Sequence, residues 1–323
     1  MSFNDIFGHS KPIGILQNAM RQDRLAHAYL FHGMDGIGKR KVALTFAKAL
    51  NCRQESFDAC DSCISCIKTD HKNHPDIEMI EAEGQYIRIN AVKDIQERMK
   101  FSPMEGRKRI VIFIEADKLN NAAANALLKT LEEPSKSNII LLITARPYQL
   151  PITILSRCQQ LRFNPLPQEV VAKLLRERFS LDESQARLLA AASGGSMGKA
   201  LDLNREAFLA LKKEVLDLVA DTTSDSPLRR LSFIRFLNDD KREILDKLEI
   251  LKTFFRDVLI FKETQEKEGL MHQDRLDLIS VFAGQRTAEK ILTGIRAIDQ
   301  AERQLAQNAN KSLTLEVMMF RLP

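Results

Sequence analysis

The feature that most constrains the fold is a glycine-rich turn between a short apolar run and a helical pattern. The apolar run is Ala28–His32, and Lys39 opens a helix-forming stretch that continues to Leu50. The turn contains Gly33, Gly36, Ile37 and Gly38. Glycines let backbone N–H groups converge on phosphates at a helix N-terminus, and a lysine in this position reaches the terminal phosphates. The pattern predicts a strand, a phosphate-binding loop and a helix; a glycine-rich turn with an incidental lysine is the alternative.

Four further apolar runs follow, separated by helical patterns. They lie at residues 76–80, 109–115, 138–144 and 159–163. The helices between them, 89–100 and 120–132, stop before Pro103 and Pro134, because proline cannot continue a helix. Alternating strands and helices predict an α/β module with a five-stranded parallel sheet and flanking helices.

The pattern changes after Pro167. Residues 168–179, 182–192 and 196–203 predict three short helices, and from about residue 204 apolar side chains recur at spacings of three and four, as in a helical bundle. The 323 residues suit two or three domains. We therefore expect an α/β domain over residues 1–165, a small helical domain over 166–205 and an all-α domain over 206–323.

Four of the five cysteines are bunched in a polar segment. They are Cys52, Cys60, Cys63 and Cys66. Thiolates at these separations can hold one tetrahedral Zn²⁺, so we expect a structural zinc module at about residues 52–74. His71 or His74 could replace one thiol, most plausibly Cys52. The fifth cysteine, Cys158, is expected to be a buried residue that packs in the protein interior.

Two positions near the loop lack what ATP hydrolysis needs. Arg40 follows the lysine, where a Ser or Thr hydroxyl would hold Mg²⁺. The run at 109–115 ends in Glu115, Ala116 and Asp117, so an alanine occupies the position of the general base. Glu115 could still reach a metal and Asp117 could be recruited, but the sequence predicts impaired hydrolysis.

Several short sequence motifs occur together with the glycine-rich loop and the cysteines. They lie at residues 3–9, 25–31, 125–134 and 156–158, the last being Ser156, Arg157 and Cys158. Together they resemble the clamp-loader branch of the AAA+ proteins, which serves bacterial DNA polymerase III. The resemblance covers residues 3 to about 201. It implies an AAA+ module with a zinc-binding insertion and a helical lid, and the remainder fits the family's collar domain by length only.

The resemblance also implies roles for single residues. Arg157 would be an arginine finger that reaches into a neighbouring subunit's ATP site, and Thr144 would be the first sensor. Gly198 stands where the family has a second-sensor arginine, and Lys199 is one residue off. The implied nucleotide-binding residues are Ile6, Phe7, Gly8, Gly33, Gly36, Ile37, Gly38, Lys39, Arg40 and Thr144, with Ile6, Phe7 and Gly8 flanking the adenine.

Three losses, at Arg40, Ala116 and Gly198, distinguish this chain from the family's gamma or tau motor subunits. They agree with a static subunit that completes the ring and donates its finger. The resemblance then implies a hetero-pentamer with gamma or tau and delta subunits, which places a sliding clamp on primer–template DNA. ATP or ADP would be bound weakly, without turnover.

Two other functions fit parts of the sequence. One is a gamma- or tau-type subunit that hydrolyses ATP itself, with Glu115 and Asp117 substituting for the missing groups. The other is a zinc-dependent nucleic-acid-binding scaffold. Its support is the basic run of Lys100, Arg107, Lys108 and Arg109, which no aromatic residue interleaves as a stacking platform would need.

Composition excludes some classes. The net charge is only +5, from 48 basic and 43 acidic residues, so a basic protein is not implied. The longest apolar run, at 139–143, is far shorter than the ~20 residues that cross a bilayer. The first residues lack a basic region and an apolar region of a signal peptide, so we expect a cytoplasmic protein.

Overall fold

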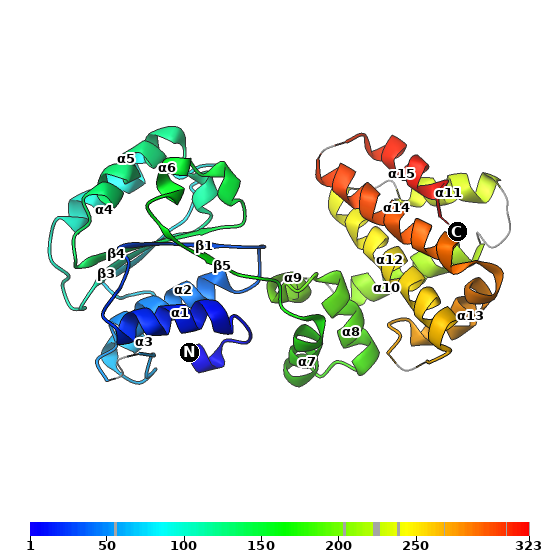
Figure 1. The fold of residues 1–323 in the computed structure, drawn as a ribbon, viewed down its shortest axis with the longest axis horizontal. Helices are drawn as coiled ribbons and strands as arrows, with labels where there is room; N and C mark the ends of the chain where they lie inside the picture. The colour runs from blue at the N-terminus through cyan, green and yellow to red at the C-terminus, as the bar shows by residue number, and fades with distance from the viewer. Residues whose placement is uncertain are drawn as a thin grey trace. The chain divides into compact units, whose positions relative to one another are not determined.

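The computed structural model describes the whole chain except residues 55, 56, 203, 204, 222–226, 238, 239, 268, 308 and 323. The described residues form two compact units (Figure 1). The first comprises Met1–Leu166 with Ser196–Gly198, and the second comprises Pro167–Gly195 with Lys199–Pro323. Among the described residues, no helix is long and apolar enough to cross a membrane.

A five-stranded sheet organises the first unit, as the alternating pattern predicts. The strands are all parallel and lie in the order β2-β3-β4-β1-β5. Their bounds are β1 Ala28–His32, β2 Ile77–Ile80, β3 Arg109–Phe113, β4 Asn138–Thr144 and β5 Gln159–Arg162. The register pairs His32 with Thr144 on one side and with Arg162 on the other. The carboxyl ends of three strands therefore meet at one edge, where open parallel sheets bind their ligands.

Alternate side chains of β1 enter two separate cores. Tyr29 and Phe31 pack in one core, whereas Ala28 and Leu30 pack in the other. One face of the sheet is covered by α1 (Ser10–Arg21) and α2 (Lys39–Leu50), and the opposite face by α4 (Ile89–Met99), α5 (Asn121–Glu132) and α6 (Ile152–Leu155) (Figure 1). The unit is thus a three-layer α/β structure whose central strand leads into the glycine-rich turn.

Short elements fill the connections. They are η1 (Phe3–Asp5), α3 (Ile64–Asp70), η2 (Ala116–Lys118) and η3 (Pro147–Gln149). The strand predicted at 109–115 ends at Phe113, because Glu115 adopts a left-handed backbone with φ 52° ahead of η2. The helix predicted from residue 120 begins one residue later, because the Asn120 side chain caps it by accepting from the Ala123 N–H.

The second unit is helical. Its helices are α7 (Gln168–Phe179), α8 (Glu183–Ala192), α10 (Arg205–Asp221), α11 (Pro227–Leu237), α12 (Lys241–Thr264), η4 (Gln273–Arg275), α13 (Leu276–Gln285), α14 (Ala288–Ala306) and α15 (Lys311–Met319), and α9 (Met197–Asp202) begins in the segment grouped with the first unit. The long helix α12 packs against α14, α13, α10 and α8. Phe254 on α12 makes edge contacts with Phe255 and with Phe282 of α13.

The division into an α/β domain, a lid and a collar stays a prediction. The helices that it assigns to lid and collar fall in one compact unit, apart from the short segment Ser196–Gly198. The predicted lid–collar boundary, after residue 205, adjoins residues 203 and 204, which lie outside the described residues.

Candidate nucleotide-binding and metal sites

The glycine-rich turn follows β1 and leads directly into α2. A Cβ atom on Gly33 would lie 2.2 Å from the carbonyl oxygen of Phe163, so only glycine fits beside the chain that leaves β5. Gly38, with φ 105°, occupies the N-cap of α2, where no side chain caps the helix. The uncapped N–H groups and the positive end of the helix dipole face the turn, an arrangement suited to an anion.

Lys39 is folded back onto this turn. Its Nζ atom donates to the carbonyl oxygens of Gly33 at 2.6 Å and Met34 at 2.7 Å, and its side chain is 5% exposed. Burial lowers the pKa of Lys39, and the nearby carboxylates of Asp35 and Asp117 oppose this shift. The ammonium group is therefore kept within the loop, next to the N-terminus of α2.

The segment preceding α1 lies against the loop through a histidine to which the sequence assigned no role. His9 Nε2 is 2.6 Å from the carbonyl oxygen of Ile37, and the His9 ring packs edge-on against Phe163. Burial lowers the pKa of His9 despite that hydrogen bond. Gly8 precedes it with φ 72°, and a Cβ atom there would lie 2.3 Å from Leu166 Cδ2. The predicted adenine-flanking segment is thus beside the loop.

Arg40 and Glu115 both form ion pairs outside the loop. Arg40 bonds Glu81 at 2.6 Å, next to the end of β2. Glu115 pairs with Lys118 at 2.7 Å, and its side chain is about half exposed. Neither side chain makes a recorded contact with Lys39 among the described residues.

Asp117 lies near the loop and interacts with its lysine. Its Oδ1 atom accepts a hydrogen bond from the Thr144 hydroxyl at 2.5 Å, and it interacts electrostatically with Lys39. Thr144 also accepts from the Arg146 N–H at 2.8 Å. Ala116 is buried. The sequence suggested that Glu115 could reach a metal and that Asp117 could be recruited, and the structure joins Asp117 to the predicted sensor Thr144.

The predicted second-sensor position lies directly on the loop. The Gly198 N–H donates to the Gly36 carbonyl at 2.8 Å, and the Ser196 hydroxyl donates to the Asp35 carbonyl at 2.8 Å. A Cβ atom on Gly198 would lie 2.8 Å from Gly36 Cα. Gly198 therefore makes a close backbone contact that any side chain would disturb.

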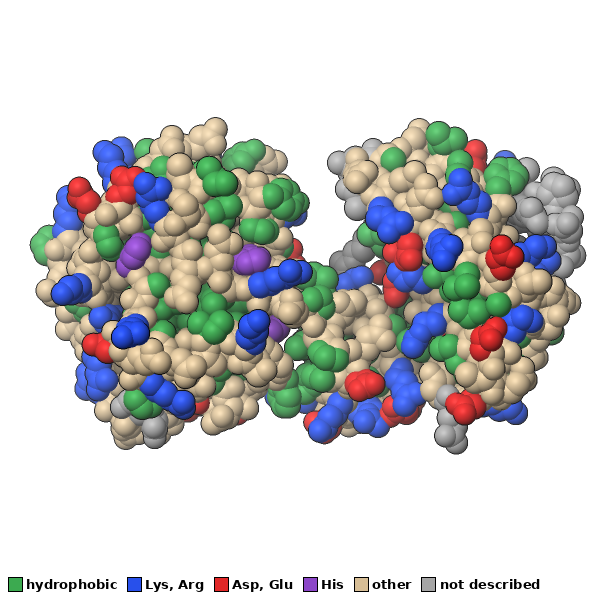
Figure 2. Space-filling view, viewed as in Figure 1, with side chains coloured by type: hydrophobic (Ala, Val, Ile, Leu, Met, Phe, Trp, Pro, Cys, Tyr) green, Lys and Arg blue, Asp and Glu red, His purple; other side chains and the backbone are tan. Residues whose placement is uncertain are grey.

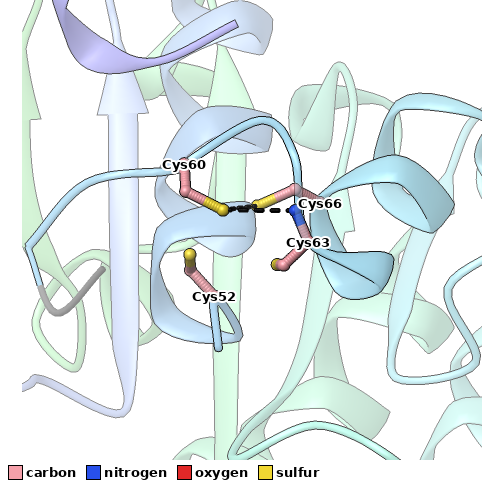
Figure 3. A group of neighbouring side chains, drawn as sticks. All are labelled: Cys52, Cys60, Cys63 and Cys66. Atoms are coloured by element: carbon pink, nitrogen blue, oxygen red, sulfur yellow. Dashed lines mark hydrogen bonds between the residues drawn. The ribbon is translucent and has the colours of Figure 1, made fainter. Parts of the chain in front are cut away.

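The four bunched cysteines converge as predicted (Figure 3). They are Cys52, Cys60, Cys63 and Cys66, and their sulfur atoms all lie within 4.8 Å of one another. The sulfur atoms of Cys60 and Cys66 are 3.9 Å apart, close to the separation of about 3.8 Å in a tetrahedral site with Zn–S bonds near 2.3 Å. Burial opposes ionisation of Cys60, yet hydrogen bonds from Ser62 and from the Cys63 N–H lower its pKa to about 6. This donor set suits a thiophilic cation.

The histidine alternatives do not join this cluster. His74 is buried, with Nε2 3.1 Å from the Ser65 hydroxyl and Nδ1 accepting from the Asp76 N–H. His71 caps the C-terminal end of α3 and is exposed. The structure brings together four cysteines, with Cys52 fully buried among them.

Arg157 lies just after α6, and Cys158 beside it is buried. The guanidinium group of Arg157 donates to Glu132 Oε1 at 2.8 Å and to the Thr153 carbonyl at 3.0 Å. About a third of the side chain is exposed. A surface arginine is thus held in one orientation by a carboxylate at the end of α5.

The basic run at 100–109 does not form a patch. Arg109 is buried, where it pairs with Asp76, and Lys108 donates to the Lys136 carbonyl. Lys100 pairs with Glu97. Three of its four cations are therefore engaged within the fold.

Comparison with known proteins gives two family models and several similar chains. The model described as DNA polymerase III, delta subunit, matches residues 8–167, and the model described as DNA polymerase III, delta subunit, C terminal, matches residues 206–323. The delta' subunit of DNA polymerase III from Bacillus subtilis (strain 168) is 31% identical over 313 residues, covering 95% of this chain and 94% of the relative. The tau subunit from the same organism is 29% identical, covering 99% of this chain and 61% of its own length. A gamma subunit-related structure from Thermotoga maritima is 20% identical, covers 96% of this chain and 98% of its own, and has a TM-score of 0.46.

Proposed function

The chain belongs to the delta-prime family of DNA polymerase III subunits, and from this premise we propose that it is a static clamp-loader subunit that donates an arginine finger. The observation that supports this proposal is the residue at the magnesium-binding position of the phosphate loop. The loop has its glycines and Lys39, but the residue at the magnesium position, Arg40, is a cation bound to Glu81. A cation cannot ligate a cation, so the chain's own site is poorly equipped for hydrolysis.

In this proposal the chemistry that the chain supports occurs on a neighbour. Arg157 is surface-accessible, and its contacts with Glu132 and Thr153 orient the guanidinium before any partner arrives. A finger neutralises charge developing on the transferred phosphoryl group and is worth ~10³–10⁵ in rate. That factor corresponds to about 4–7 kcal/mol of barrier.

We propose that the chain's own loop binds ATP or ADP weakly and does not turn it over. Lys39 would exchange its two carbonyl partners for phosphate oxygens, and the N–H groups at the start of α2 would hold the same phosphates. Ile6, Phe7, Gly8 and Ile37 would border the adenine side of the site. Asp117 and Thr144 bond each other near Lys39, so Asp117 rather than Glu115 would be the acidic residue of a gamma- or tau-type ATPase, the second candidate function.

Zinc is the proposed occupant of the cysteine centre. Cys52, Cys60, Cys63 and Cys66 would hold it as four thiolates, leaving no position for a substrate, so its chemistry is structural cross-linking. The metal would stabilise the segment between α2 and β2, which carries few apolar side chains of its own. Cys63 is the N-cap residue of α3, so ligation would also fix the start of that helix.

The proposed partners follow from the family. They are gamma or tau and delta subunits in a hetero-pentamer, a sliding clamp and primer–template DNA, in the cytoplasm. Residues 166–205 would form a lid and residues 206–323 the collar that joins the ring. A nucleic-acid-binding scaffold is less favoured, because its basic run is largely engaged within the fold.

Steady-state ATPase measurements test the proposal. The protein alone should show no turnover, while a complex reconstituted with motor subunits, clamp and primed DNA should hydrolyse ATP. Replacing wild type by Arg157→Ala in the complex should lower kcat by at least the share of turnover that comes from the one active site that loses its finger. The matched control is Arg88→Ala, an exposed arginine of the same unit, which should leave the rate unchanged.

Turnover by the isolated protein that is lost with Lys39→Ala and unaffected by Arg157→Ala would favour the gamma- or tau-type ATPase. Assembly of the Arg157→Ala complex must be checked by gel filtration. A complex that assembles and keeps its full rate would overturn the finger role.

A further inference from the structure

A cleft of about 400 Å³ opens within the second unit, between α7, α8 and α12. Basic and acidic side chains gather over α7 and α8 in this part of the surface (Figure 2). The charged lining residues are Lys173, Arg176, Arg187, Arg256, Glu169 and Glu183. Four cations face two carboxylates, so the cleft has a formal charge of +2.

One carboxylate organises two of the guanidinium groups. Glu183 Oε1 accepts from Arg187 Nε at 2.7 Å, and Glu183 Oε2 pairs with Arg176 Nη1. Each arginine has five N–H donors, so most of their donors have no partner recorded within the described part of the unit. Glu183 thus orients both guanidinium groups and leaves most of their N–H donors available to a ligand.

Arg256 enters the cleft from α12 without a carboxylate of its own. Its recorded polar contact, among the residues that the structure describes, is with the sulfur of Met271 at 3.7 Å. Thioether sulfur is a weak acceptor, so this contact leaves the guanidinium available. Arg256 is therefore the lining cation that forms no carboxylate ion pair within the described part of the unit, although the neighbouring Asp257 carboxylate interacts with it electrostatically.

A buried carboxylate holds the backbone at Met271, one of the residues that line the cleft. Asp257 is fully buried and accepts from the N–H groups of Met271 at 2.7 Å and His272 at 2.8 Å. Gly269 adopts φ 91°, and a Cβ atom there would lie 3.6 Å from Arg187 Nη1. The guanidinium of Arg187 therefore lies beside the backbone of Gly269, two residues before the first of these hydrogen-bonded N–H groups.

From this geometry we infer that the cleft binds an oligophosphate group. Guanidinium forks match phosphate oxygens bidentately, and a charge of +2 favours a multivalent anion. The first turn of α7, with Gln168 and Glu169, also lines the cleft, and its N-cap Pro167 offers no side-chain acceptor, so the helix dipole adds to the field. None of the ten lining residues is aromatic, so a base has no stacking partner. The recognised group is a diphosphate unit, whether free pyrophosphate or the phosphate tail of a nucleotide.

Calorimetric titration of the full-length protein tests this inference. All variants carry Lys39→Ala, which removes the ammonium group of the phosphate loop, and the effect of Arg256→Gln in this background separates binding in the cleft from binding at the N–H groups that the loop keeps. Pyrophosphate should bind, with an affinity that falls as ionic strength rises. Arg256→Gln should weaken binding at least tenfold, whereas Arg178→Gln, an exposed arginine of α7 outside the cleft, should leave it unchanged.

Titration with ATP in the same background distinguishes the two sources. Binding of ATP with the same dependence on Arg256 identifies a nucleotide tail, and binding of pyrophosphate alone identifies the free anion. The inference is overturned if pyrophosphate gives no binding in the Lys39→Ala protein. It is also overturned if folded Arg256→Gln and Arg187→Gln variants both bind as tightly as their parent. Failure of this inference would not affect the proposed function, because the ATPase test measures the effect of Arg157→Ala.

Discussion

Replacing Gly198 by alanine tests whether the family's second sensor has become a structural contact. The new Cβ atom would meet Gly36 Cα at 2.8 Å and the Gly36 carbonyl oxygen at 3.0 Å, both backbone atoms that cannot rotate away. Relieving such overpacking typically costs about 1–3 kcal/mol. The shift would also weaken the hydrogen bond from the Gly198 N–H to Gly36, worth about 1 kcal/mol.

Alanine also favours a helix over glycine by up to about 1 kcal/mol, so the net loss should be about 1–3 kcal/mol. Gly14→Ala is the matched control, because Gly14 lies inside α1 with nothing within 4 Å of its Cβ position. Thermal unfolding of the first unit should show a lower midpoint for Gly198→Ala, by about 2–4 °C for each kcal/mol, and an unchanged or higher one for Gly14→Ala. A Gly198→Ala protein as stable as Gly14→Ala would refute the reasoning.

Two further predictions concern the first unit. A chelator that competes with thiolates for the metal should lower the thermal unfolding midpoint of the wild-type protein but not that of Cys63→Ser, because the cysteine centre of this variant lacks one ligand. Equal shifts of the midpoint in both proteins would argue against a role for a metal. Burial alone would raise the pKa of Asp76, but hydrogen bonds from the N–H groups of Glu105, Gly106 and Met104 and from Arg109 outweigh it, so the pKa is lowered. The stability that the ionised carboxylate confers is therefore complete above about pH 4, and it is lost as the pH falls through the pKa of the folded state. Asp76→Asn should cost about 3–5 kcal/mol at neutral pH, because Arg109 loses its buried partner, and should flatten the acid limb of the stability profile; exposed Asp94→Asn should do neither.

The sheet could be predicted because each strand is a short apolar run set between helical patterns. Strand burial follows that pattern closely in β3 and β4, where every residue is buried. The cysteine centre could be predicted because its ligands are local in sequence, within fifteen residues. Cys52 at the end of α2 and Cys66 inside α3 need only the turn between the two helices to bring them together.

The remaining site features depend on contacts between distant residues. The hydrogen bond from Gly198 to Gly36 joins residues that are more than 150 positions apart in the sequence, so the sequence showed only a missing arginine. Whether Glu115 or Asp117 faces the loop depends on one backbone conformation, the left-handed Glu115, which turns its side chain towards Lys118. Arg109 looked like part of a basic run because its buried partner, Asp76, precedes it by more than thirty residues.

The glycine motif itself has a structural reason that is independent of nucleotide. Any side chain at Gly33 would collide with the Phe163 carbonyl, so the fold requires glycine where β1 meets the chain leaving β5. Lys39 differs, because its carbonyl partners would not demand a lysine if the loop bound no anion: an uncharged residue would avoid burying an ammonium group. A lysine at this position with 5% exposure is therefore a stronger argument for phosphate binding than the glycines are. It follows that Lys39→Ala is a more direct test of nucleotide binding than a glycine substitution, provided that the unfolding midpoint of the variant is measured alongside, because Lys39 also donates to two carbonyl groups of the loop.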